Sequence, residues 1–165
     1  MKLLPHPDQL HLQAAVGWLE LGNHAEANEE LEKIQASLRA HPLVLRVRWK
    51  VYAKAKRWDG AQEISRTLAE MLPDDASVWL LHATTFYYAG DYQAAYDIAK
   101  AKVETFPEDW KLHYDLACYC SRLGKLEDAK TNLHRAMELG DRQKVQLAAL
   151  DDPDLEALRK GIGGS

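Results

Sequence analysis

One spacing recurs along most of this 165-residue chain. Alanine returns every 34 residues, at Ala27, Ala61, Ala95 and Ala129. Glycine stands five residues earlier in three of the four units, and Lys56 takes its place in the second; the glycines are Gly22, Gly90 and Gly124. A period of this length is typical of helical hairpins that stack and bury their apolar faces against one another. Because a small residue at a fixed place lets two helices pack closely, the spacing predicts an all-α array of about four hairpins.

The apolar residues follow a helical period over nearly the whole array. We expect the paired helices at residues 8–21 and 24–38, 43–55 and 58–72, 76–89 and 92–106, and 109–123 and 126–139. The corresponding repeats span 8–41, 42–75, 76–109 and 110–141. The turns within the pairs are so short that the two helices of each pair must run antiparallel.

The period breaks after the fourth hairpin, and residues 142–160 are expected to form C-terminal capping helices. The run Asp152-Pro153-Asp154 is a strong helix start, with an N-cap side chain, a proline in the first turn and a carboxylate near the helix N-terminus. Leu155 and Leu158 should then cover the apolar face that the last hairpin exposes. The glycine-rich residues 161–165 are expected to be a disordered tail.

Several positions of the units share more than the alanine. In the third unit they are Trp79, Ala83, Phe86, Gly90, Tyr92, Ala95, Ala99 and Pro107. This pattern resembles the tetratricopeptide repeat, over residues 8–141, and the chain looks like small bacterial members of that family without an assigned activity. The resemblance implies a right-handed α-solenoid whose first helices line a concave groove that holds peptides or partner helices. It implies no chemical reaction.

Cations dominate the first helix of the second unit. Arg46, Lys50 and Lys54 recur at i, i+4 and i+8, and no acidic residue lies between positions 43 and 58. Like charges at this spacing destabilise a helix by about 0.2–0.5 kcal/mol per pair. By the resemblance, these side chains face the groove with residues of the later units, namely Leu80, Thr84, Tyr87, Tyr88, Lys111, Tyr114 and Arg122. Cations and tyrosines together would suit an acidic peptide. The alternative is a solvated face, or pairing with acids of a neighbouring helix such as Glu20.

Some members of the family hold a partner's terminal carboxylate with Lys, Asn and Arg side chains from three repeats. Arg46, Lys50 and Lys111 occupy suitable places for this arrangement. Leu81 and Asp115, however, stand where Asn and Arg would be needed. The departure argues against a carboxylate clamp of that kind.

The residues that could carry chemistry do not form a recognisable catalytic or metal-binding pattern. The chain contains no H-E-x-x-H, no G-x-S-x-G and no phosphate-binding loop. None of the seven histidines forms an i, i+4 pair with another, although zinc needs three or four converging ligands. Cys118 could be a reactive thiol beside Arg122, or a buried one, and it has no evident base. We expect a non-catalytic protein without metal or cofactor.

Composition narrows the possible partners and compartments. The net charge of −4 disfavours nucleic acid as a partner. The sequence has no run of 18 or more apolar residues, and its first residues do not suggest a secretory signal. A cytoplasmic location is therefore expected. The leading hypothesis is an interaction module, a scaffold or chaperone-like protein, that binds a protein partner of acidic character. The alternative is a structural protein that forms homodimers or larger homo-oligomers without a peptide ligand.

Overall fold

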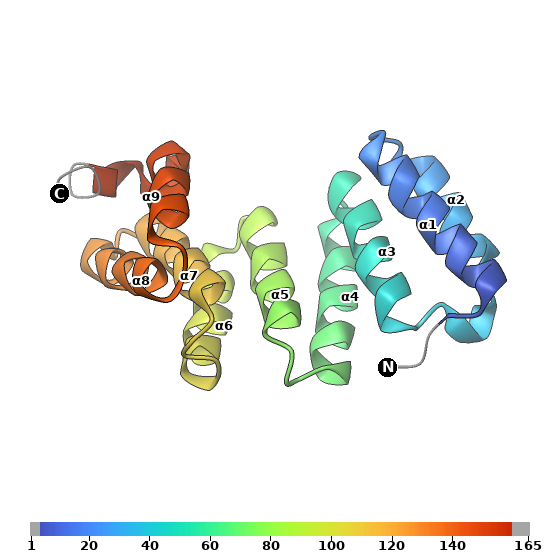
Figure 1. Cartoon of the computed structure of the whole chain (residues 1–165), viewed down its shortest axis with the longest axis horizontal. Coiled ribbons are helices and arrows are strands. Elements are labelled where there is room, and N and C mark those ends of the chain that lie inside the picture. The colour runs from blue at the N-terminus through green and yellow to red at the C-terminus, as the bar shows by residue number, and fades with distance from the viewer. Residues whose placement is uncertain (1–3, 160–165) are drawn as a thin grey trace. The chain divides into compact units, whose positions relative to one another are not determined.

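The computed structural model describes residues 4–159, and all the regular elements found within this range are helices (Figure 1). The chain comprises two compact units, Met1–Pro73 and Asp74–Ser165. The predicted all-α fold of helical hairpins with C-terminal capping helices is confirmed. The predicted disordered tail, residues 161–165, lies outside the described residues, as does Lys160 at the end of the predicted cap.

The first unit contains two hairpins, joined by the short 3-10 helix η1 (Ala36–Leu38). The helices are α1 (His6–Glu20), α2 (His24–Lys33), α3 (Pro42–Lys54) and α4 (Trp58–Met71). α2 ends before the expected residue 38, because the backbone of Ile34 is extended (φ −64°, ψ 138°). The buried side chain of Asp8 holds the extended segment that follows α2, because its Oδ1 accepts a hydrogen bond from the Gln35 amide at 2.7 Å.

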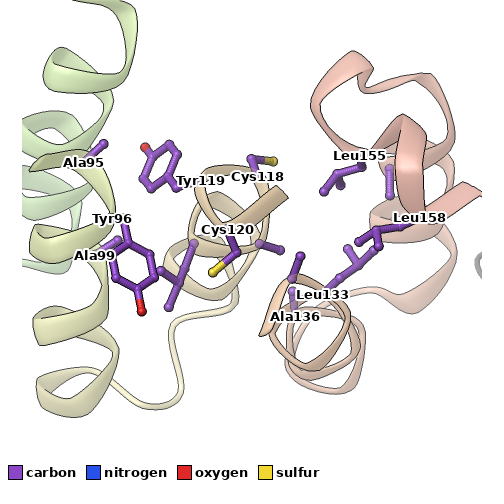
Figure 2. Close-up of a cluster of buried hydrophobic side chains, with 14 of the residues drawn as sticks. Ala95, Tyr96, Ala99, Cys118, Tyr119, Cys120, Leu133, Ala136, Leu155 and Leu158 are labelled. Carbon is purple, nitrogen blue, oxygen red and sulfur yellow. The ribbon is translucent and has the colours of Figure 1, made fainter. Parts of the chain in front are cut away.

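The second unit contains two further hairpins and a cap. Its elements are α5 (Ala76–Tyr88), α6 (Tyr92–Thr105), α7 (Trp110–Arg122), α8 (Leu126–Leu139), α9 (Arg142–Asp151) and the 3-10 helix η2 (Pro153–Leu158). The repeating alanines Ala95 and Ala129 are fully buried at the helix contacts. Leu155 and Leu158 of η2 join the same buried cluster as Leu133 of α8 (Figure 2). The cap therefore covers the apolar face of the last hairpin, as the sequence predicts.

Aspartates begin most of the helices of the second unit. The side chain of Asp75, Asp91, Asp109 and Asp141 each accepts a hydrogen bond from a backbone amide of the first turn that follows it. Such caps satisfy amides that have no partner within the helix. Within the part of the chain that the structure describes, no helix has the length and apolar character needed to cross a membrane.

The hairpin α3–α4 has one unusually close contact, at Gly60. A Cβ at this position would lie 2.5 Å from Cδ2 and Cε2 of the Tyr52 ring, whereas a Cβ at Gly17 of α1 would meet nothing within 4 Å. Gly60→Ala is therefore expected to destabilise the protein by about 1 kcal/mol or more, because the ring must move. Gly17→Ala should stabilise it by about 0.5–1 kcal/mol through helix propensity alone. Urea unfolding of the two variants gives the comparison. An equal stabilisation by both would contradict the close contact.

Candidate functional site

In the first unit, the predicted cations lie along α3. Pro42 occupies the first turn of this helix, where its missing amide is not needed, and the His41 ring accepts a hydrogen bond from the Leu43 amide. Lys50 and Lys54 are exposed, and Arg46 is half-buried. Arg46 also lines a surface hollow of about 360 Å³ between α1 and α3, whose other lining residues are Leu12, Gln13, Val16, Leu43 and Val47. The structure thus places Arg46 at an apolar hollow, and Lys50 and Lys54 follow it on the same helix.

The neighbouring cation Arg48 lies in a different environment. Its Nη1 is 2.6 Å from Oε1 of Glu32 on α2, and Arg39 binds the other carboxylate oxygen of Glu32 at 2.8 Å. The hydrogen bond from Arg48 is the main reason why the pKa of Glu32 lies below its ordinary value. Pairing with acids of a neighbouring helix therefore occurs on α3, at Arg48.

In the second unit, three of the predicted residues line a second hollow. Leu80, Lys111 and Tyr114 surround a space of about 470 Å³ with Trp110, Asp115, Lys144, Val145 and Ala148. The hollow is formed by α5, α7 and α9, and most of its wall is apolar. Lys111 of α7, Lys144 of α9 and Asp115 are the charged residues that line this hollow.

Three predicted residues bind carboxylates that belong to the chain itself. Tyr114 donates a hydrogen bond to Oδ2 of Asp152 at 2.9 Å. Nε of Arg122 lies 2.6 Å from Oδ1 of Asp154, and the Tyr87 hydroxyl donates to the same carboxylate. We call Tyr87, Tyr114 and Arg122 the carboxylate-binding surface, and residues 152–158 the cap segment. The sequence predicts these side chains as contacts for a partner, whereas in the structure the cap segment occupies them.

A cluster of tyrosines supports this surface. The Tyr87 ring stacks on Tyr119, with centroids 5.4 Å apart and planes at 28°, and it meets the edge of Tyr88 at 5.2 Å. Tyr119 is buried, whereas Tyr88 is 60% exposed. Burial, followed by the hydrogen bond to Asp154, raises the pKa of Tyr87 well above its ordinary value. Burial and the bond to Asp152 do the same to the pKa of Tyr114. Both phenols are therefore hydrogen-bond donors at physiological pH.

Asp115 is a polar residue of this region that sequence analysis did not select as a site. Burial raises the pKa of its carboxyl group to about 7, the charges of Asp109 and Asp152 act in the same direction, and hydrogen bonds with Thr84 and Tyr119 oppose them. Thr84, a predicted site residue, also has its hydroxyl 3.5 Å from that of Tyr119. The sequence signal was present, since an acid stands one helical turn after Lys111, but nothing in the sequence shows that its carboxyl group is half-buried.

Cys118 is buried against the cap segment. Its thiol donates to Oδ2 of Asp152 at 3.6 Å, and burial followed by the charges of Asp152 and Asp115 raises its pKa far above the ordinary value. The reactive-thiol alternative therefore has no support in the structure. The sulfur and one carboxylate oxygen each of Asp152 and Asp154 lie within 4.8 Å of one another, a spacing that could suit a metal ion. The carboxylates, however, already bind Tyr87, Tyr114 and Arg122, and the thiol is held in its protonated form.

No protein-family model matches the chain, and neither does any curated protein. Several solved structures match it. MamA 41-end from Desulfovibrio magneticus RS-1 is 15% identical with a TM-score of 0.69, and the match covers 96% of this chain and 92% of that one. The MamA RS-1 ArsTM double mutant is 19% identical with a TM-score of 0.69, covering 82% and 76%. A chain of the APC/C hetero-tetramer Cut9–Hcn1 is 18% identical with a TM-score of 0.66, covering 93% and 29%.

These proteins are built of tetratricopeptide repeats. At such identities the likeness concerns the fold. It agrees with the resemblance of the repeating sequence positions to the tetratricopeptide repeat. It confirms that the chain has the tetratricopeptide-repeat fold.

Proposed function

We propose that this chain, which has the tetratricopeptide-repeat fold, is a non-catalytic interaction module that binds an acidic peptide or helix of a protein partner. The first helices of its hairpins provide the contacts. The observation that carries the proposal is the apolar hollow of the first unit, which Arg46 lines, together with the exposed Lys50 and Lys54 on the same helix. An apolar side chain of a partner can enter the hollow while its carboxylates meet these cations.

Two further observations support an acidic partner. Lys50 and Lys54 are exposed on α3, a helix that contains no acidic residue. Carboxylates of a partner can bind such side chains. In the second unit, predicted contact residues already bind the carboxylates of Asp152 and Asp154. The Cut9–Hcn1 hetero-tetramer, which shares the fold, is itself an assembly of different chains.

Charge reversal tests this proposal. A partner is first isolated by affinity capture from lysate at low salt and identified by mass spectrometry, and its dissociation constant is then measured. The triple variant Arg46→Glu, Lys50→Glu, Lys54→Glu should weaken binding by about tenfold or more and reduce its salt dependence, because three charge contacts become repulsive.

The control is a variant with the same change of net charge on other helices, Arg66→Glu, Lys130→Glu, Arg142→Glu, which are all exposed. It should bind the partner as the unaltered chain does at each salt concentration. If both triple variants bind with unchanged affinity, the three cations of α3 have no part in recognition. If both weaken equally, only the net charge matters.

A homodimer is the second candidate, and exposed apolar side chains favour it. Tyr88 is 60% exposed and Leu147 of α9 is 64% exposed. Light scattering across a dilution series separates the two candidates. A module that awaits a partner should keep the mass of one chain, 18.7 kDa, at every concentration, whereas a homodimer should approach twice that mass at the higher concentrations.

A further inference from the structure

The two ends of the cap segment make different kinds of contact with the rest of the second unit. At one end, Asp152 and Asp154 meet the carboxylate-binding surface. At the other end, Leu155 and Leu158 are 0% and 4% exposed and pack in the core cluster of the second unit (Figure 2). An acidic pair followed by spaced leucines is a pattern that a partner peptide could also present.

The surface is built to bind carboxylates. Its two phenols are donors, and a guanidinium that is 43% exposed stands at its edge. Hydrogen bonds with charged partners are about twice as strong as neutral ones, so they lose about half of their strength when the charge is removed. The side chains of Tyr87 and Tyr114 are half-buried, and both hydroxyls donate to carboxylates of the cap segment.

The cap segment is a short element that follows α9. Its residues 153–158 form a 3-10 helix, whose hydrogen bonds are weaker than those of an α-helix. The extended backbone of Asp152 (φ −76°, ψ 116°) separates it from α9. Rotation at this one residue would move η2 while α9 keeps its place.

We propose that the cap segment is a built-in occupant of a docking site, and that an acidic, leucine-containing segment of a partner protein binds the carboxylate-binding surface in its place. The pattern that fits is the chain's own, two acidic residues separated by one position and followed by leucines. A tethered segment acts at an effective concentration in the millimolar range. A partner segment must therefore bind more tightly than the tethered one, and the cap segment sets a threshold for binding. This inference rests on the proposed function for the acidic character of the partner.

Cys118 provides a natural probe of the docking site. Its thiol lies under Asp152 and is 6% exposed, whereas Cys120 is 1% exposed. Figure 2 shows the two sulfurs on different sides of α7, with that of Cys118 facing the cap. Departure of the cap segment should uncover Cys118 and leave Cys120 buried. Alkylation of each cysteine can be followed separately by mass spectrometry, so that Cys120 reports general unfolding.

The test variant is the full chain with Asp152→Asn and Asp154→Asn. Asparagine can still cap η2, so mainly the charge is lost. Cys118 should be alkylated about tenfold faster than in the unaltered chain, with Cys120 unchanged. A synthetic peptide with the sequence of residues 150–159 at millimolar concentration should restore protection of Cys118. The same peptide with asparagine in place of Asp152 and Asp154 should not, and an added Arg122→Gln change should abolish the protection.

Equal alkylation of Cys118 in the variant and the unaltered chain would overturn the proposal, and so would a lack of protection by the acidic peptide. If Cys120 also reacts faster, the variant is unfolding, and the proposal is then tested by hydrogen exchange of the unaltered chain. There, the acidic peptide should speed hydrogen exchange of the amides of residues 154–158, and no acceleration would overturn the proposal. If light scattering shows that the variant is a dimer, the site binds a second copy of the chain, and this outcome would also overturn the proposal. None of these outcomes depends on Arg46, Lys50 and Lys54, so this proposal and the proposed function can fail separately.

Discussion

Leu133→Ala is expected to lower the free energy of unfolding by about 2–5 kcal/mol, the range for a leucine removed from a packed core. Leu133 lies on α8, is 3% exposed, and packs in the cluster that joins α6, α7, α8 and the cap. In Figure 2 it stands between Cys120 and Leu158. The alanine would leave a cavity, because the helices on every side are fixed by their own contacts.

Leu147→Ala is the matched control, since the same atoms are removed from a side chain that is 64% exposed on α9. It should change stability by no more than about 0.5 kcal/mol. Urea unfolding followed by circular dichroism measures both variants, and the midpoints should shift at a constant slope. A loss of less than about 1 kcal/mol for Leu133→Ala would mean that the helices around it close the cavity. The cluster would then be less rigid than the structure indicates.

Local signals account for most of what the sequence predicts about the fold. Gly90 has a φ of 89° and ends α5 where the repeat pattern places a turn. Lys56, which stands in the corresponding place of the second unit, adopts a φ of 55° and ends its helix in the same way. Asp152 caps η2 as its position before Pro153 predicts. Each of these outcomes depends on residues within a few positions of one another, which is why a single sequence is enough.

The candidate site depends on contacts that no local pattern contains. Tyr87 and Asp154 are 67 positions apart, and Tyr114 and Asp152 are 38 apart. The repeat phase places Tyr87 and Tyr114 on the first helices of their hairpins, and this prediction is independent of the cap. It cannot show that an acidic segment after the last repeat returns to the same surface. The acidic residues of the cap segment were recognised only as a helix start, although their charge also complements Arg122.

Asp115 gives the second large effect, which depends on pH. Its pKa in the folded chain is raised to about 7 by burial and by Asp109 and Asp152, whereas in the unfolded chain it should lie near 3.9. The folded state therefore holds this proton more tightly than the unfolded state does. Below about pH 4 the residue is protonated in both states and does not disfavour folding. As the pH rises from there through 7, folding requires uptake of a proton, and the free energy of unfolding falls.

Asp115→Asn removes this titration while keeping the shape of the side chain. The variant should gain stability over the unaltered chain as the pH rises, by about 2.5 kcal/mol between pH 5 and pH 8. Other titrating groups are common to both proteins and cancel in the difference. Asp97→Asn, on the exposed side of α6, should follow the unaltered chain throughout. Urea midpoints at four pH values give the curves. A constant gap between Asp115→Asn and the unaltered chain would show that the carboxylate is already ionised in the folded state at pH 5. Thr84 and Tyr119 would then stabilise the charge more than burial and the neighbouring aspartates disfavour it.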